Sequence, residues 1–168
     1  EENSRLILQS VAEGIFGTDT EGRCTFVNEA AQAMLGYASD EILGRDVHDL
    51  FHHLNPDGTP HPRQNCPIYL AYTQGITLFR RDEVFWRKDG SYFDVSYTSV
   101  PQRKGDAIIG SVVVFRDITE RKKGEDALRE SEYRLQSILA TSNEGFWWIN
   151  NDAVTLAVND AMCNILGR

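Results

Sequence analysis

The sequence predicts an α+β domain in which two strands precede a group of short helices and three strands follow it. Short apolar segments of strand length alternate with polar turns in both parts of this region. Between them, capping residues, prolines and glycines mark the ends of several short helices. A long charged segment of helical composition then leads to an incomplete recurrence of the opening pattern. We therefore expect one complete domain, a connecting helix and the start of a second domain.

The chain opens with a predicted hairpin followed by a capped helix. An apolar run at residues 15–18 leads through a polar turn into a second strand at residues 23–27. Asn28 then stands where a helix N-cap belongs, because its side chain can accept from free backbone N–H groups. The helix over residues 29–35 ends at Gly36, a usual residue just after a helix C-terminus.

Short helices and a long loop come next. Ser39 is predicted to cap residues 40–43, and Asp46 is predicted to cap residues 47–51. Residues 52–66 are polar and rich in proline, which indicates a loop. Pro67 is suited to the first position of a following helix that runs to about residue 73, since its missing N–H costs nothing there.

Three strands complete the predicted domain. The first covers about residues 78–87, and Asp89-Gly90 then gives a strong hairpin signal. In the second, residues 91–100, apolar and polar side chains alternate as in a half-buried strand. Residues 101–106 are expected to form a loop. The last strand, residues 107–116, is apolar on both faces, which predicts a central position in the sheet.

A charged helical segment follows, at residues 120–141. Leu128, Leu135 and the pair Ile138-Leu139 are spaced for a narrow apolar seam. The seam fits either a solvated connecting helix or a helix that pairs with a second copy in a dimer.

The opening pattern recurs at a constant offset of 131 residues. Residues 144–167 align without a gap on residues 13–36, with the turn, the capping asparagine and the final glycine in matching places. Residues 142–168 are therefore predicted to be the truncated start of a second domain. Its apolar residues, Phe146 to Ile149, lack the later strands that would cover them. We expect them to pack on another surface, of the first domain or of a partner chain.

Composition and charge restrict the function classes. With 41% hydrophobic and 25% charged residues, the chain has the composition of a soluble globular protein. Its net charge of −8 argues against nucleic acid as a partner, since phosphate binding needs a basic surface. The three cysteines are too few and scattered for a disulfide framework, which favours the cytoplasm. We expect no membrane span in this segment, which lacks an initial Met and is expected to be part of a longer protein that could be anchored elsewhere.

Several short motifs occur in an order typical of one family. Asn28-Glu29-Ala30 precedes Leu35-Gly36-Tyr37, and Gly44-Arg45 follows the next short helix. Residues 87–91, Arg-Lys-Asp-Gly-Ser, form the hairpin signal, and residues 110–121 form a last strand that exits through Asp-Ile-Thr-Glu-Arg. Each motif alone is weak. In this order and at these separations they resemble PAS domains over residues 4–122.

The resemblance implies an antiparallel five-stranded sheet with short helices on one face, followed by a long signalling helix. It divides the chain into a complete sensor domain at residues 1–119, which includes an N-terminal helix, a linker helix at 120–141 and a truncated second domain at 142–168. Such modules regulate an output domain in the same chain, often a histidine kinase or a cyclic-dinucleotide enzyme. A homodimer through the N-terminal and linker helices is expected. The implied signal exit comprises Asp117, Ile118, Thr119 and Arg121.

The resemblance also implies a pocket for a small molecule or cofactor. Its candidate lining residues are aromatic or apolar: Tyr69, Tyr72, Trp86, Phe93, Val95 and Tyr97. Flavin photoreceptors of the family carry a reactive cysteine where Val47 stands, and haem-binding members usually carry a histidine on the helix that here spans residues 67–73 and has none. Non-covalent flavin stays open, and no cofactor is assigned. The aromatic residues can equally be core, in a ligand-free relay module.

The loop at residues 52–66 is unusual because it gathers histidines and a cysteine: His52, His53, His61 and Cys66. Imidazole and thiolate groups bind transition metals, although these spacings match no zinc motif. Cys66 could instead be redox-sensitive, since the start of a helix lowers the pKa of a thiol. A purely structural role is the third alternative. We expect no enzyme, because the sequence contains no nucleophile–base or phosphate-loop motif.

Overall fold

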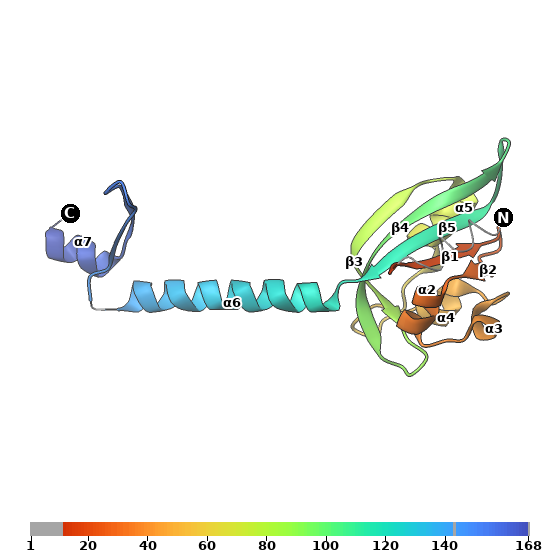
Figure 1. Ribbon diagram of the computed structural model, residues 1–168, viewed down its shortest axis with the longest axis horizontal. Coiled ribbons are helices and arrows are strands. Elements are labelled where there is room, and N and C mark those ends of the chain that lie inside the picture. The colour runs from red at the N-terminus through yellow and green to blue at the C-terminus, as the bar shows by residue number, and fades with distance from the viewer. Residues whose placement is uncertain (1–11, 143, 168) are drawn as a thin grey trace. The chain divides into compact units, whose positions relative to one another are not determined.

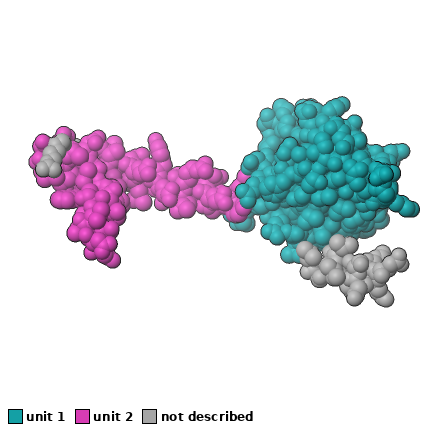
Figure 2. Space-filling view, turned by 90° about the horizontal axis from the view of Figure 1, so that it is seen from above, with its two compact units in different colours: residues 1–120 teal, residues 121–168 magenta. Residues whose placement is uncertain are grey.

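The computed structural model describes residues 12–142 and 144–167. The chain forms two compact units, residues 1–120 and residues 121–168 (Figure 2). The N-terminal helix that we expected lies outside the described residues. Within the described residues, none of the helices combines the length and the apolar character that crossing a bilayer requires.

The first unit is built on a five-stranded antiparallel sheet (Figure 1). The strand order is β2-β1-β5-β4-β3, so the last strand lies at the centre as its apolar faces predicted. Phe16 lies opposite Val113 between β1 and β5. The predicted α+β class and antiparallel sheet are confirmed. The strands are β1 (Gly14–Thr18), β2 (Cys24–Val27), β3 (Leu78–Trp86), β4 (Tyr92–Lys104) and β5 (Ala107–Asp117).

Short helices connect β2 to β3, and their ends follow the local chemistry of the sequence. Asn28 caps α2 by accepting from the Ala31 N–H, and Gly36 ends it in the left-handed conformation at φ 75°. Asp46 caps α4 by accepting from the backbone N–H groups of His48 and Asp49. The helices are α2 (Glu29–Leu35), α3 (Ser39–Ile42), α4 (Val47–Phe51), the 3₁₀ turn η1 (Arg63–Asn65) and α5 (Pro67–Gln74).

Two local predictions were wrong. Ser39 is the first residue of α3 and not its cap; the Glu41 carboxylate instead accepts from the Ala38 N–H at 3.0 Å and closes the helix start. Residues 101–104, expected in a loop, extend β4 to Lys104. Pro101 is tolerated because it lies beyond Ser99, the last residue of β4 that pairs with β3, and so has a partner strand on one side only.

The core lies between the sheet and the short helices and is rich in aromatic rings. Phe85 of β3 is fully buried at its centre, with ring centroids 5.2 Å from Phe51 of α4 and 5.3 Å from Phe115 of β5. Phe16 of β1 meets Phe51 edge to face at 5.2 Å. Such aromatic contacts add to the stabilisation from area burial alone, so this cluster joins three strands to α4.

The second unit holds most of a long helix and a small hairpin–helix motif. The helix is α6 (Thr119–Thr141); β6 (Trp147–Ile149) pairs with β7 (Thr155–Val158), and α7 (Asp160–Leu166) follows. Asn159 caps α7 and also accepts from the Phe146 N–H at 2.8 Å. In the first unit Asn28 accepts from the Ile15 N–H at 2.9 Å in the same manner. The two asparagines therefore join hairpin to helix by equivalent hydrogen bonds.

Candidate functional site

The exit from the sheet is held by hydrogen bonds between β4 and the start of α6. The Ile118 N–H donates to the Asp94 carbonyl at 2.8 Å, and the Asp94 N–H donates to Thr119 Oγ1 at 3.1 Å. Asp117 Oδ1 accepts from the Thr119 N–H at 2.9 Å, and Ile118 is buried. The side chains of Asp117 and Thr119 thus bond to backbone groups at the point where the strand becomes a helix. Arg121, the fourth predicted exit residue, pairs with Glu125 one turn along α6 at 3.6 Å.

Arg87, in the hairpin between β3 and β4, links this exit to the rest of the first unit. Its guanidinium lies 3.1 Å from Asp117 Oδ2. The same group donates from Nε to the Met34 carbonyl at 2.9 Å, near the end of α2. It also lies over the Phe93 ring, 4.5 Å from the centroid, a cation–π contact. One side chain therefore contacts α2, the core face of β4 and the exit.

The predicted pocket residues mostly pack against other rings. Phe93, Val95 and Tyr97 alternate along β4 and are buried. The Tyr69 and Tyr72 rings meet edge to face at 5.5 Å on α5. Trp86 donates its indole N–H to the Leu54 carbonyl at 3.0 Å and lies 5.1 Å from Tyr92. Their role as ligand contacts stays a prediction.

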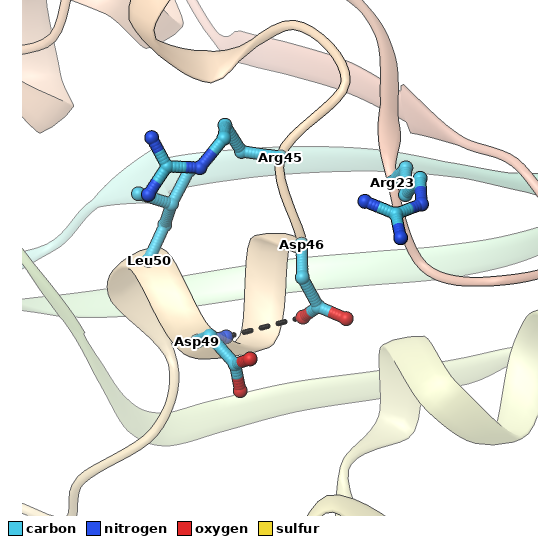
Figure 3. A pocket seen from close by; sticks show the side chains of 5 residues that line it. All are labelled: Arg23, Arg45, Asp46, Asp49 and Leu50. Carbon is cyan, nitrogen blue, oxygen red and sulfur yellow. Dashed lines mark hydrogen bonds between the residues drawn. The ribbon is translucent and has the colours of Figure 1, made fainter.

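A polar pocket of about 320 Å³ lies elsewhere, between the start of β2 and α4 (Figure 3). It is lined by Arg23, Arg45, Asp46, Asp49 and Leu50. Arg63 pairs with Asp46 at 2.5 Å and with Asp49 at 2.7 Å, so both carboxylates already have a cationic partner. Cofactor pockets are mostly apolar, and this lining differs from that pattern.

A buried group of histidines and a cysteine forms where α4 meets the start of α5. His48 and His52 stand four residues apart, on the same face of α4 and its C-cap. Cys66 immediately precedes α5, and its side chain is 1% exposed. His52 Nδ1 lies 3.2 Å from Cys66 Sγ. One ligand atom from each of His48, His52 and Cys66 lies within 4.8 Å of the others.

The second nitrogen of His52 is held by a carboxylate. His52 Nε2 lies 2.8 Å from Glu83 Oε2 on β3, and the Tyr97 hydroxyl donates to the same oxygen. His61 lies alongside, with its ring centroid 4.6 Å from that of His52. A small cavity of about 30 Å³ lies between His52, His61 and Glu83. It has room for a water molecule or an ion but is far too small for an organic cofactor.

These contacts shift the ionisation of the central groups. Burial alone raises the pKa of the Cys66 thiol, but the imidazoles of His48, His52 and His61 outweigh it and lower that pKa to about 4. Burial alone lowers the pKa of His52, but Cys66 and Glu83 raise it to about 9. Cys24 is also buried, and there burial raises the thiol pKa to about 12. The two buried cysteines therefore differ: Cys66 is placed to be a thiolate and Cys24 a neutral thiol.

The structure brings together part of the predicted metal or redox set and adds to it. His52, His61 and Cys66 are gathered, whereas His53 belongs to neither candidate ligand group in the described residues. His48 and Glu83 were missed. For His48 the sequence did contain a signal, because His48 and His52 are four residues apart and so share one face of a helix. Glu83 comes from a strand 31 residues after His52, and no local pattern connects the two.

Comparison with known proteins adds three kinds of likeness. A family model described as PAS domain matches residues 12–120, and a second with the same description matches residues 133–168. The probable diguanylate cyclase DgcE of Escherichia coli is 31% identical over 133 residues, 79% of this chain and 11% of that protein. The sensor histidine kinase DcuS of Escherichia coli is 31% identical over 157 residues, 82% of this chain and 25% of that protein. The chain thus spans a quarter or less of these two relatives.

Solved structures share the fold at lower identity. A PAS domain from Colwellia psychrerythraea superposes with a TM-score of 0.59 at 21% identity, covering 71% of this chain and 97% of that one. An RNA-binding light-oxygen-voltage receptor superposes with a TM-score of 0.62 at 22% identity, covering 79% and 37% of the two chains. At these identities the likenesses concern the fold alone.

Proposed function

The chain belongs to the PAS domain family, and from this premise we propose that residues 12–120 sense a state and pass it to an output domain through α6. The chain is a sensory module of the kind found in histidine kinases and a diguanylate cyclase. Domains of this family are sensory rather than catalytic, and we assign no reaction to this segment. The output is a kinase or cyclic-dinucleotide domain elsewhere in the parent protein.

The observation that supports relay most is the bonding of the exit. Asp94 bonds to Ile118 and Thr119 on the first residues after β5, so a displacement of β4 displaces the start of α6. Arg87, in the hairpin between β3 and β4, adds a charge-assisted contact to Asp117. A change in the core that moves Phe93 also reaches the exit, since Phe93 lies under the Arg87 guanidinium. These contacts therefore couple the conformation of β4 and the core to the position of the start of α6.

The test is a chimera in which residues 12–141 replace the matching region of the sensor histidine kinase DcuS. Joint substitution of Asp117→Asn and Thr119→Val removes the ion pair and the Thr119 hydroxyl acceptor. We expect autophosphorylation to change at least threefold in either direction. Asp126→Asn, at an exposed site of α6, is the matched control and should leave the rate unchanged. Equal rates in the exit variant and the parent chimera would contradict relay through this junction.

A second proposal, dimerisation through α6, is supported by the exposed apolar residues of that helix. Leu128, Leu135 and Ile138 are each more than half exposed. Leu128 and Leu135 stand one heptad apart, the spacing of a coiled-coil seam. Sedimentation equilibrium should then show a dimer that Leu128→Lys with Leu135→Lys dissociates, while Leu156→Lys in β7 does not. A monomeric parent chain at all concentrations would refute it. The N-terminal helix, the other expected contact, lies outside the described residues.

Three further assignments are also proposals. The match of residues 133–168 to the same family supports a second PAS domain that begins there, in tandem with the first. The three free cysteines support a cytoplasmic location for this segment. A small organic ligand between the predicted aromatic residues needs those rings to move apart, and native mass spectrometry of the purified chain tests whether one is retained.

A further inference from the structure

The group at His48, His52 and Cys66 has the donor types that a transition metal prefers. Two imidazoles and a thiolate are zinc ligands, whereas magnesium and calcium prefer oxygen. All three side chains are at least nine-tenths buried. They come from two adjoining helix ends, α4 and α5, which fixes their backbone positions. The three donor side chains are therefore gathered before any ion binds.

The distances fit a shared ion. Bond lengths of zinc to sulfur and to nitrogen, at a tetrahedral angle, place the two ligand atoms roughly 3.5 Å apart. His52 Nδ1 and Cys66 Sγ are 3.2 Å apart, and one nitrogen of His48 lies within 4.8 Å of both ligand atoms. Small side-chain rotations complete the approach.

The outer contacts of His52 are those of a metal ligand. A histidine that binds metal through one nitrogen usually donates its other N–H to a carboxylate, which fixes the ring and its tautomer. His52 Nε2 does so with Glu83 Oε2, and the Tyr97 hydroxyl holds that oxygen in turn. This arrangement directs Nδ1 toward Cys66. It favours the ligand group that includes Cys66 over the alternative of His52, His61 and Glu83, in which Glu83 would itself bind the ion.

Three buried imidazole nitrogens in this region lack a hydrogen-bond partner in the described part of the chain. They are His48 Nδ1, His61 Nε2 and His53 Nδ1, and the last belongs to neither candidate ligand group. Buried polar atoms are nearly always paired, so each such atom calls for an explanation. The Nδ1 atom of His61 lies 3.2 Å from Asn55 Oδ1, a contact that leaves Nε2 to face inward as a lone pair. A bound cation is one kind of partner that satisfies a buried imidazole nitrogen.

We propose that this domain binds one zinc ion through His48, His52 and Cys66, with His61 beside the fourth coordination position. The proposal concerns a site within the sensor domain and does not depend on relay through α6. It accounts for the carboxylate behind His52 and for the placement of a cysteine at the start of α5. Zinc takes the place of the one proton that lies between His52 Nδ1 and Cys66 Sγ, so binding releases that proton.

The experiment uses the 168-residue chain after removal of metals with a chelator. Zinc titration by calorimetry should give one site, and Co²⁺ should give visible absorption typical of tetrahedral coordination with a thiolate. Cys66→Ser and His48→Ala should each weaken zinc binding more than a hundredfold. Glu83→Gln, which leaves all three ligands in place, should weaken it about tenfold to a hundredfold.

Matched controls separate loss of the site from loss of the fold. His53→Ala removes a neighbouring histidine outside the ligand group, and Cys163→Ser removes a cysteine in the second unit; both should bind zinc as the parent does. Circular dichroism without metal should show the same fold for every variant. The proposal is overturned if the parent chain binds no zinc, if Cys66→Ser binds as tightly as the parent, or if His53→Ala abolishes binding.

Discussion

Asn28 holds the opening hairpin, α2 and the preceding chain together, so its truncation should be among the most damaging single changes. Its Oδ1 accepts from the N–H groups of Ile15 and Ala31, both at 2.9 Å, and its Nδ2 donates to the Glu13 carbonyl at 2.9 Å. The side chain is buried at 5% exposure. Asn28→Ala removes these three bonds and takes away the acceptor that the Ile15 and Ala31 N–H groups use in the described part of the chain.

The expected loss follows from those bonds. Each contributes about 1 kcal/mol net, and a buried donor left unpaired costs more. We therefore expect Asn28→Ala to lower the free energy of unfolding by about 3 kcal/mol, more than a hundredfold in the unfolding equilibrium. Asn28→Asp keeps both acceptor bonds but sets a carboxylate against the Glu13 carbonyl, and should cost about 1–2 kcal/mol.

The assay is urea denaturation followed by the fluorescence of Trp86. Trp147 and Trp148 lie in the second unit and are more than half exposed, so both are replaced by phenylalanine in every protein compared. With a urea slope of about 2 kcal/mol per molar, the midpoint of Asn28→Ala should fall by about 1.5 M. A loss below about 1 kcal/mol would refute the reasoning, since it would mean that water replaces the three bonds.

Three other substitutions test the packing around the sheet. Gly110→Ala should lower the free energy of unfolding by more than about 3 kcal/mol in urea, because φ is 152° and a Cβ would lie 1.8 Å from the Thr18 carbonyl oxygen; normal stability would contradict that clash. Phe85→Ala should cost about 3–5 kcal/mol in the same assay as a cavity opens among buried rings, and a loss under 1 kcal/mol would show that the core collapses into the space. Asp46→Ala should cost about 1–2 kcal/mol through its cap and its ion pair with Arg63, whereas Asp46→Asn should keep most of the cap; equal losses would assign the effect to charge alone.

Local chemistry was enough to predict most of the fold. Asn28 with Gly36, Asp46 and Pro67 each fix a helix end through groups within a few residues, so their pattern is visible in the sequence. Ser39 misled because an N-cap signal there competes with Glu41, whose carboxylate closes the helix one residue earlier. The length of β4 was underestimated. Pro101 can stay in the strand because β3 begins at Leu78, opposite Ser99, and this pairing is a property of the sheet that the local sequence does not show.

The candidate site was predicted only in part, for a similar reason. Cys66, His52 and His61 lie within one loop and attracted attention as a cluster. The sequence could not show that His53 lies outside the candidate ligand groups or that His48 and Glu83 belong to them. Both facts depend on how α4 and β3 pack against the start of α5. The exit residues were placed by family resemblance. Their bonds to Asp94 and Arg87, which give the exit its physical meaning, come from strand pairing.

The central claim is that the sheet and the start of α6 are coupled through Arg87 and the Asp117–Thr119 junction. Amide hydrogen exchange of Arg87→Ala measures this directly, because the substitution lies in a hairpin outside α6. We predict that the amides of Ile118 and Thr119, which donate to Asp94 and Asp117, exchange at least tenfold faster than in the parent, while Lys88→Ala, a neighbour on the same hairpin, leaves them unchanged. Unaltered exchange at the start of α6, with changes confined to residues 87–91, would contradict the account.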